Sequence, residues 1–260
     1  MKYELTKQIV KVGNSAGVLL PREWLNGMAR VELVKKPINI KKDLLEIIGD
    51  YLEDAIGIYL TGSYARGEES ERSDVDILVI TNSVNKRIVR GVYNIILISK
   101  EKVEKTLEHN ILPLLPMLLE AKAIINQNLI TMLTKTPITK KNLSYYLETT
   151  KSALSVNKSL IELDKLSNKL CSDSIAYSLM LRLRSYYIVD CLMKNSMWSN
   201  ADFIKIIKNI SGSNNAYEGY IRIKDKKKEK EMLATKEADK ICNYLEEGIK
   251  RHQAWLTKTR

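Results

Sequence analysis

The spacing of hydrophobic residues changes twice along the chain and divides it into three parts. Residues 1–36 contain short apolar runs separated by turn residues, which is typical of β-strands. In residues 38–137, β-favouring runs alternate with segments whose apolar residues recur at helical spacing, and in residues 139–260 the spacing is helical throughout. The pattern therefore predicts an α+β multidomain protein, with boundaries at Pro37 and near Pro137.

The first part is predicted to be a small β-rich unit. Residues 7–25 indicate a strand, a Gly-Asn-Ser turn, a second strand and a short helix opened by Pro21, and a further strand is expected at 30–35. So few strands cannot enclose a hydrophobic core within one chain. We therefore expect this unit to form a homodimer with a second copy of the chain.

The second part is predicted to be an α/β core and the third an all-α bundle. Apolar spacing predicts a first helix from residue 40. The core continues as strand 58–60, helix 64–66, strand 77–80, strand 91–98, helix 100–109, helix 111–120 and a last short strand 121–126, which is followed by the segment 128–135. The helices of the bundle are expected at 143–163, 174–193, 201–210 and 231–256, with Ser-, Gly- and Asn-rich breaks at 195–200 and 211–215.

A Gly-Ser turn follows the strand expected at 58–60. Gly62 lets the backbone approach a phosphate oxygen because it carries no Cβ. Ser63 offers an amide and a hydroxyl at the start of a short helix, where anions are favoured. The turn therefore predicts a phosphate site, which Arg66 is placed to assist.

Two aspartates stand at the start of the next apolar strand. Asp74 and Asp76 flank Val75, and alternation along a strand puts both carboxylates on one face. Two hard oxygen ligands close to phosphate oxygens suit Mg²⁺, which completes its octahedral shell with water and substrate. An ordinary turn followed by a solvated aspartate pair is the alternative interpretation.

The order Gly62-Ser63, ten residues, Asp74-X-Asp76 resembles the signature of the polymerase-β-like nucleotidyltransferase superfamily, and in particular its minimal nucleotidyltransferase branch. The resemblance implies a core with a mixed sheet and a Mg²⁺-dependent transfer of a nucleoside monophosphate from an NTP to a hydroxyl. By family habit the donor is ATP. The resemblance assigns Asp74 and Asp76 to metal binding and catalysis, and Gly62, Ser63 and Arg66 to nucleotide binding.

The third carboxylate that this family takes from a later strand is missing here. The strand expected at 91–98 contains no acid, and Asn94 stands at the position that looks equivalent. A neutral oxygen ligand weakens a second metal site and removes a base for the acceptor hydroxyl. Glu101 and Glu104 could substitute, but we expect both on the solvated side of the following helix.

The segment Val12-Gly-Asn-Ser-Ala-Gly-Val-Leu-Leu-Pro-Arg-Glu23 resembles the AbrB/MazE-like swapped-hairpin family, the DNA-binding half of many transcription factors and antitoxins. The resemblance implies a homodimer that contacts DNA. The residues it suggests for phosphate contacts are Lys7, Lys11, Arg22 and Arg30, with Asn14 and Ser15 in the loop. A dimerisation cap with merely solvated lysines is the alternative.

The C-terminal bundle resembles the helical HEPN proteins that accompany minimal nucleotidyltransferases. Their nuclease motif is an Arg followed several residues later by a His. Arg182 and Arg184 are followed by no such His, and Arg251 directly precedes His252, so nuclease activity is not supported.

Two stretches with aromatic and basic residues, 182–187 and 217–224, could face the cleft and touch a base or the acceptor. Core aromatics with flanking helix charges are the alternative. The mixed-charge run at 224–231 is expected to be a solvated loop or helix start.

Composition adds limits to this picture. A formal charge of +11 and a pI near 9.3 favour nucleic acid or nucleotides as partners, although a Lys-rich surface also serves solubility alone. No signal peptide is visible and the apolar stretch at 111–119 is too short to span a bilayer, so we expect a cytoplasmic protein without membrane partners.

The cysteines and histidines do not form a zinc motif. The cysteines are expected to be buried free thiols and the histidines to lie at surface or helix-cap positions. The residues concerned are Cys171, Cys191, Cys242, His109 and His252.

These observations leave three hypotheses. The first is a Mg²⁺-dependent nucleotidyltransferase acting on a protein tyrosine, an RNA end or a small molecule, which the resemblances set on the antitoxin side of a toxin–antitoxin pair. The second is a DNA-binding regulator whose transferase-like domain has lost turnover. The third is a structural dimer without a ligand.

Overall fold

The computed structural model describes residues 4–32, 38–70 and 73–258. The chain forms two compact units that divide between Asp43 and Leu44. The predicted limits of the three parts, 1–36, 38–137 and 139–260, stay predictions.

The first unit is a hairpin with little interior. Strands β1 (Ile9–Val12) and β2 (Ser15–Val18) pair antiparallel, and a short 3₁₀ helix (Arg22–Trp24) follows Pro21. Many of its apolar side chains are exposed in the single chain, with Leu19 and Leu25 each 70% exposed. Residues 30–32 are not in a strand, and the rest of the strand expected at 30–35 lies outside the described residues.

The second unit contains a mixed five-stranded sheet in the order β5-β6-β4-β3-β7. The strands are β3 (Ala55–Thr61), β4 (Val75–Thr81), β5 (Lys86–Arg90), β6 (Tyr93–Ser99) and β7 (Lys122–Ile125). Strands β4 and β6 are parallel and the other neighbours are antiparallel. The expected mixed sheet is thus confirmed. The sequence did not predict β5, because its basic residues are exposed at the sheet edge, where charge is common.

The helices of this α/β core match the expected pattern with shifted ends. They are α1 (Ile40–Ile47), α2 (Gly62–Arg66), α3 (Lys100–His109), α4 (Leu115–Glu120) and α5 (Gln127–Leu133), with a 3₁₀ helix at Gly49–Asp54. The hydroxyl of Ser99 caps α3 by accepting the amide of Lys102, and Val103 and Leu107 face inward.

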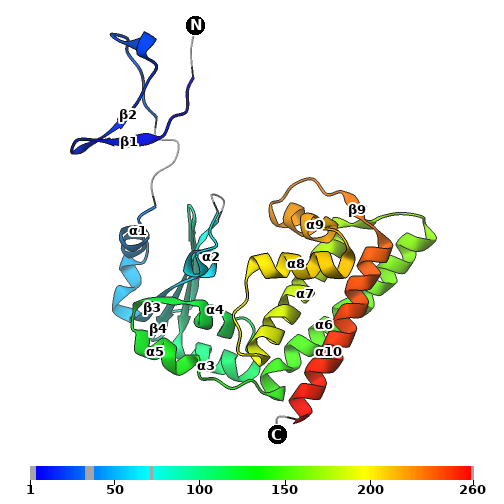
Figure 1. Cartoon of the computed structure of the whole chain (residues 1–260). Coiled ribbons are helices and arrows are strands. Elements are labelled where there is room, and N and C mark those ends of the chain that lie inside the picture. Colours follow the sequence, from blue (N-terminus) through cyan, green and yellow to red (C-terminus); the bar gives the residue numbers. More distant parts are fainter. Residues whose placement is uncertain (1–3, 33–37, 71–72, 259–260) are drawn as a thin grey trace. The chain divides into compact units, whose positions relative to one another are not determined.

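Five helices form the C-terminal bundle: α6 (Lys140–Leu166), α7 (Asp173–Met193), α8 (Asn200–Ser211), α9 (Asn215–Lys224) and α10 (Thr235–Lys258). In Figure 1, α10 runs alongside α6 and α7, and α9 packs on α7. The predicted start of the last helix at residue 231 is wrong, because Glu231–Leu233 forms strand β9 and the helix begins at Thr235. This strand pairs with β8 (Cys171–Ser172) and buries Leu233.

One hydrophobic core continues from the sheet into the bundle. It contains Tyr59 and Leu78 of the sheet, Leu107 of α3, and Leu179 and Leu245 of the bundle. At the junction, buried Asn142 of α6 donates its side-chain amide to the carbonyl of Leu107 at 3.2 Å. The sheet and the bundle are therefore packed as a single body.

The expected burial of the three cysteines is confirmed. His109 lies exposed in the last turn of α3, as predicted. The prediction for His252 is wrong, because this side chain is buried in the bundle, stacks on Tyr186 and hydrogen-bonds Tyr146. No helix within the described residues is long and apolar enough to cross a membrane.

Candidate functional site

Sheet register brings the Gly-Ser turn against the aspartate pair. Thr61 of β3 lies opposite Asp76 of β4, and its hydroxyl donates to the Asp76 carbonyl at 3.2 Å. The next residue, Gly62, has a φ of +69°, and a Cβ there would lie 2.5 Å from Asp76 Oδ2. Only glycine satisfies both the backbone conformation and this close approach.

The two aspartates offer oxygen ligands at the start of β4. Asp74 is exposed immediately before the strand, and Asp76 is its second residue and half-buried. Across residues 4–32, 38–70 and 73–258, neither carboxylate takes part in an ion pair with a lysine, arginine or histidine. Two such uncompensated carboxylates two residues apart fit one divalent cation of the Mg²⁺ type.

Asn94 lies beside Asp76 but uses both ends of its amide. In the parallel register, Asn94 of β6 is the partner of Asp76. Its Nδ2 donates to Asp76 Oδ1 at 2.7 Å, and its Oδ1 accepts from Nε of Arg87 on β5 at 2.9 Å. Asn94 is therefore part of a hydrogen-bonded relay between the Asp76 carboxylate and the Arg87 guanidinium.

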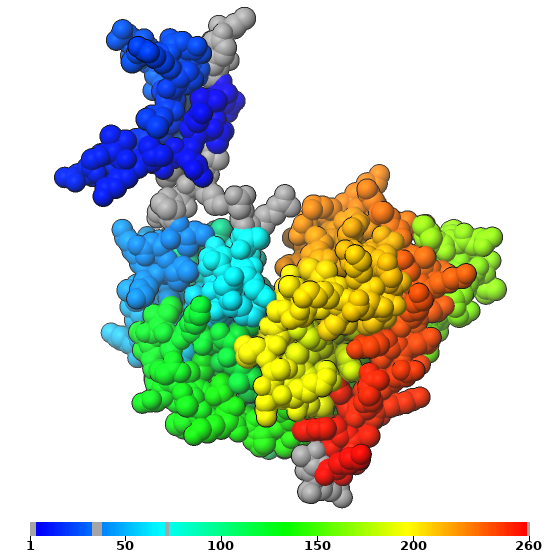
Figure 2. Space-filling model, in the orientation of Figure 1, coloured from blue at the N-terminus to red at the C-terminus, as the bar shows by residue number. Residues whose placement is uncertain are grey.

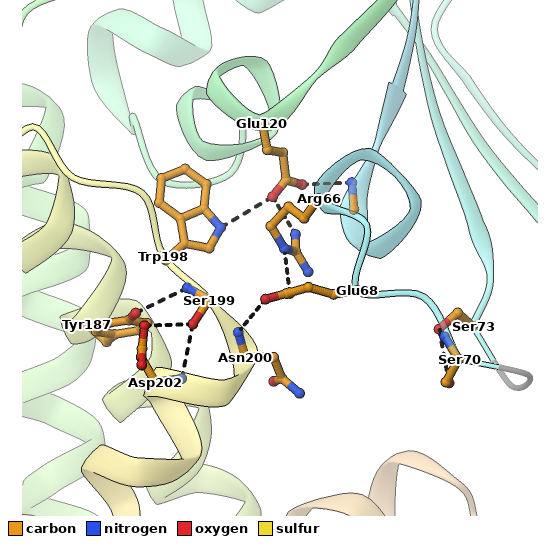
Figure 3. A network of polar contacts seen from close by, with 11 residues as sticks. Arg66, Glu68, Ser70, Ser73, Glu120, Tyr187, Trp198, Ser199, Asn200 and Asp202 are labelled. Atoms are coloured by element: carbon orange, nitrogen blue, oxygen red, sulfur yellow. Dashed lines mark hydrogen bonds and ion pairs between the residues drawn. The ribbon is translucent and has the colours of Figure 1, made fainter.

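Glu120, the last residue of α4, binds the turn from the other side (Figure 3). Its Oε1 accepts the backbone N–H of Gly62 at 2.8 Å, and its Oε2 accepts from Arg66 Nη1 and from Trp198 Nε1, the latter at 3.2 Å. The side chain is only 7% exposed. One carboxylate thus ties the turn to the bundle segment before α8.

A second carboxylate repeats this connection. Glu68 accepts from Arg66 Nε at 2.9 Å and from the backbone N–H of Asn200, the first residue of α8, at 3.1 Å. Figure 2 shows the cyan surface around α2 beside the yellow surface at the start of α8. Burial alone would lower the pKa of Arg66, but hydrogen bonds and charges from Glu68 and Glu120 raise it, so the guanidinium stays charged.

The two aromatic and basic stretches have different surroundings. Arg184 and Tyr187 line a narrow recess at this junction together with Arg66, Trp198 and Asn200. In the other stretch, Tyr217 and Tyr220 pack against each other at 6.0 Å between ring centroids, and Arg222 forms an ion pair with buried Asp173. The interpretation of residues 217–224 as core aromatics with flanking charge is confirmed.

The remaining predicted residues lie on other elements of the chain. Lys7, Lys11, Arg22 and Arg30 belong to the first unit, where all four are exposed. Glu101 and Glu104 are exposed on α3 and face Lys105 and Lys100, as expected for solvated positions.

Sequence reasoning missed Glu120, Trp198 and Arg87. Glu120 directly follows the apolar segment 111–119, which contains no other acid. An acid at the end of such a segment is only a weak indication of a buried ion pair. Trp198 lies in a segment expected only to break two helices, and Arg87 lies on the strand that was not predicted.

Comparison with known proteins matches part of the chain to a family model. Residues 40–133 match the family model described as the nucleotidyltransferase domain. Over 57 residues the chain is 40% identical to a curated protein of Methanocaldococcus jannaschii, which is named a putative protein adenylyltransferase. The match covers 22% of this chain and 52% of that protein, so the chain spans about half the length of the curated relative it matches.

Two solved structures resemble the chain distantly. A nucleotidyltransferase-like protein from Exiguobacterium sibiricum is 14% identical with a TM-score of 0.38, covering 82% of this chain and 75% of the other. A spectinomycin adenyltransferase from Enterococcus faecialis, solved with ATP and spectinomycin, is 13% identical with a TM-score of 0.42, covering 81% and 98%. Likenesses of this size carry no argument about function.

Proposed function

Because residues 40–133 match the nucleotidyltransferase domain, we propose that the protein transfers a nucleoside monophosphate, AMP in the first instance, from an NTP to a hydroxyl acceptor in a Mg²⁺-dependent reaction. The observation that carries the proposal is the contact between Gly62 and Asp76. It holds a turn suited to phosphate directly against a carboxylate suited to a cation.

Each residue of the site has a distinct role in this proposal. The Ser63 hydroxyl binds a phosphate oxygen, while the Gly62 amide stays with Glu120 and fixes the shape of the turn. Asp74 and Asp76 would hold the cation, which when bound would neutralise triphosphate charge and polarise the α-phosphorus. Arg66 supports the turn through its two carboxylate partners.

The reaction is an in-line displacement at the α-phosphorus. The acceptor oxygen forms a bond to phosphorus, the bond from phosphorus to the bridging oxygen breaks, and its electron pair leaves with pyrophosphate. Neutral Asn94 cannot take the hydroxyl proton, and Asp74 is occupied with the cation, so the proton passes to water.

The acceptor would bind on the bundle side of the turn. Arg184 and Tyr187 line the recess beside Arg66 there and offer one cation and one aromatic surface. The name of the Methanocaldococcus jannaschii relative makes a protein hydroxyl the first acceptor to test, ahead of an RNA end or a small molecule. The setting in a toxin–antitoxin pair rests on the sequence resemblances alone.

Calorimetric titration with ATP and the other NTPs, with and without Mg²⁺, tests the proposal. Wild type should bind ATP only with Mg²⁺, and the double variant Asp74→Ala/Asp76→Ala should not bind. The matched control is Glu101→Ala/Glu104→Ala, which removes two exposed acids of α3 and should bind like wild type. Equal binding by all three proteins, or no binding by wild type, would contradict the proposed function.

A second candidate function, DNA binding by the first unit, is favoured by one observation. Lys7, Lys11, Arg22 and Arg30 are all exposed, and none of them forms an ion pair among the described residues. Binding of duplex DNA should then weaken steeply with salt and be lost in a variant with all four changed to Gln. The same loss should not follow from Asp74→Ala, which separates this function from nucleotide transfer.

Homodimerisation through the first unit is proposed on its exposed apolar residues. A single hairpin leaves Leu19, Leu25, Met28 and Val31 at least 70% exposed, and a second copy would cover them. Light scattering of the intact chain should give twice the mass of one chain, and Leu19→Lys/Leu25→Lys should give one. A monomeric wild type would contradict the dimer.

A further inference from the structure

The relay beside the aspartate pair has a defined orientation. Asp76 is joined to Asn94, and Asn94 to Arg87, by hydrogen bonds of 2.7 and 2.9 Å. A carboxylate can only accept and a guanidinium can only donate, so the amide must present Nδ2 to Asp76 and Oδ1 to Arg87. The amide orientation is therefore fixed by its two partners.

This arrangement does not fit a second metal ion. A metal would need the Asn94 oxygen, and the positive charge of the Arg87 guanidinium that donates to this oxygen would repel a second cation. The Asn94 amide also presents its N–H group, which cannot ligate a metal, to Asp76 Oδ1. In the described parts of the chain, no group of three or more His, Cys, Asp or Glu side chains is arranged to hold a metal. What remains is Asp74 and the second oxygen of Asp76, a ligand set for one ion.

The relay supplies the charge that a second ion would have brought. A carboxylate with a divalent cation carries a net charge of +1, and an amide with a guanidinium carries the same charge. Arg87 is exposed, and among the described residues its two terminal nitrogens have no hydrogen-bond partner. They are available to donate to a phosphate oxygen, in a geometry that suits guanidinium groups.

We propose that the site, given the function proposed above, works with a single divalent cation held by Asp74 and Asp76, and that the Arg87 guanidinium anchored on Asn94 replaces a second one. In the displacement described above, Arg87 donates hydrogen bonds to a non-bridging oxygen of the α-phosphate and stabilises its charge as pyrophosphate leaves. Arg87 would then be a catalytic residue, and Asn94 a positioning residue for it.

The direct test counts bound Mn²⁺ by electron paramagnetic resonance in an equimolar mixture of the protein and an ATP analogue with a methylene between its α- and β-phosphates. Wild type should bind one Mn²⁺ per chain. Asn94→Asp/Arg87→Ala, which restores a third acid and removes the cation beside it, should bind two. Two ions in wild type, or equal numbers in the two proteins, would overturn the inference while leaving the proposed function intact. Failure of wild type to bind the analogue at all would overturn both.

A second measurement tests the role of Arg87 itself. Arg87→Ala should weaken binding of the analogue about tenfold, as expected for loss of a charged hydrogen bond. Arg90→Ala is the matched control, because Arg90 is exposed on the same strand but three residues away, on the opposite face of the sheet. Equal effects of the two variants would show that only general positive charge matters and would overturn the assignment.

Discussion

The Glu120 carboxylate accepts the backbone N–H of Gly62 at 2.8 Å, although the two residues are 58 positions apart in the sequence. The same carboxylate binds Arg66 and the indole of Trp198. The shape of the turn therefore depends on a residue of α4 and, through it, on the bundle.

Replacing Glu120 by Gln should disturb this connection. The variant removes a charge that is 7% exposed and leaves Arg66, 14% exposed, with Glu68 alone. Loss of one member of a buried ion pair costs about 3 kcal/mol of unfolding free energy. Urea unfolding of wild type and Glu120→Gln measures this change in unfolding free energy. The control variant Glu104→Gln, on the surface of α3, should change the unfolding free energy by less than about 0.5 kcal/mol. Equal small effects would mean that the contact contributes little.

Replacing Gly62 by Ala should disrupt the nucleotide site. The new Cβ would meet Asp76 Oδ2 at 2.5 Å, and φ is +69°. We expect a loss of about 1–3 kcal/mol in stability together with loss of Mg²⁺-dependent ATP binding. Gly67→Ala separates the two causes, because Gly67 has a φ of +71° but no atom within 4 Å of the position that a Cβ would occupy. That variant should lose stability and keep ATP binding, and parallel loss of binding in both would contradict the steric explanation.

Stability should fall in mild acid because of His252. Burial lowers the pKa of this imidazole to about 4 against an ordinary value of 6.5, even though the charge of Asp190 acts in the opposite direction. The unfolded chain therefore binds a proton below pH 6.5 that the folded chain does not bind until about pH 4. Between these values the unfolding free energy should decrease by about 3 kcal/mol as pH falls.

Urea unfolding of wild type and His252→Gln across this pH range measures the effect. The variant should show a flatter dependence, whereas exposed His109→Gln should follow wild type. An unchanged slope in His252→Gln would assign the acid sensitivity to other groups.

The ion pair between Asp173 and Arg222 should be a larger source of stability than any surface pair. Asp173 is 2% exposed and accepts two hydrogen bonds of 2.7 Å from Arg222 and one from the Lys230 amide. Arg222→Met leaves that carboxylate buried and unpaired, at a cost of about 3–5 kcal/mol. Lys205→Met breaks the exposed pair with Asp202 and should cost less than about 0.5 kcal/mol. Thermal unfolding of both variants would show whether this ranking holds.

Much of the fold could be predicted because its elements carry their own pattern. The strands around Ile58, Leu78 and Ile95 are buried apolar runs, and the bundle helices repeat apolar residues at helical spacing. Strand β5 could not be predicted in this way, because an edge strand with exposed basic residues has no apolar signal. His252 was misplaced for a related reason, since one polar residue on a helix does not reveal which side chains surround it.

The residues of the candidate site also fall into a group that the sequence could predict and a group that it could not. Gly62, Ser63, Asp74 and Asp76 are close in the sequence and form a motif with a physical rationale. Their neighbours Glu120, Arg87 and Trp198 come from distant elements, and only the pairing of strands and the packing of α4 and the bundle bring them together. Contacts between such distant elements produce no regular spacing in the sequence, so sequence patterns cannot predict them.

The hydrophobic core that runs from Tyr59 of the sheet to Leu245 of α10 has a thermodynamic consequence. The sheet and the bundle must unfold cooperatively, because neither can unfold without exposing apolar side chains of the other to water. A nucleotide bound at the Gly62 turn would stabilise the folded state of the whole body by mass action. Amide hydrogens in α10, far along the chain from the turn, should therefore exchange more slowly with solvent once ATP is bound.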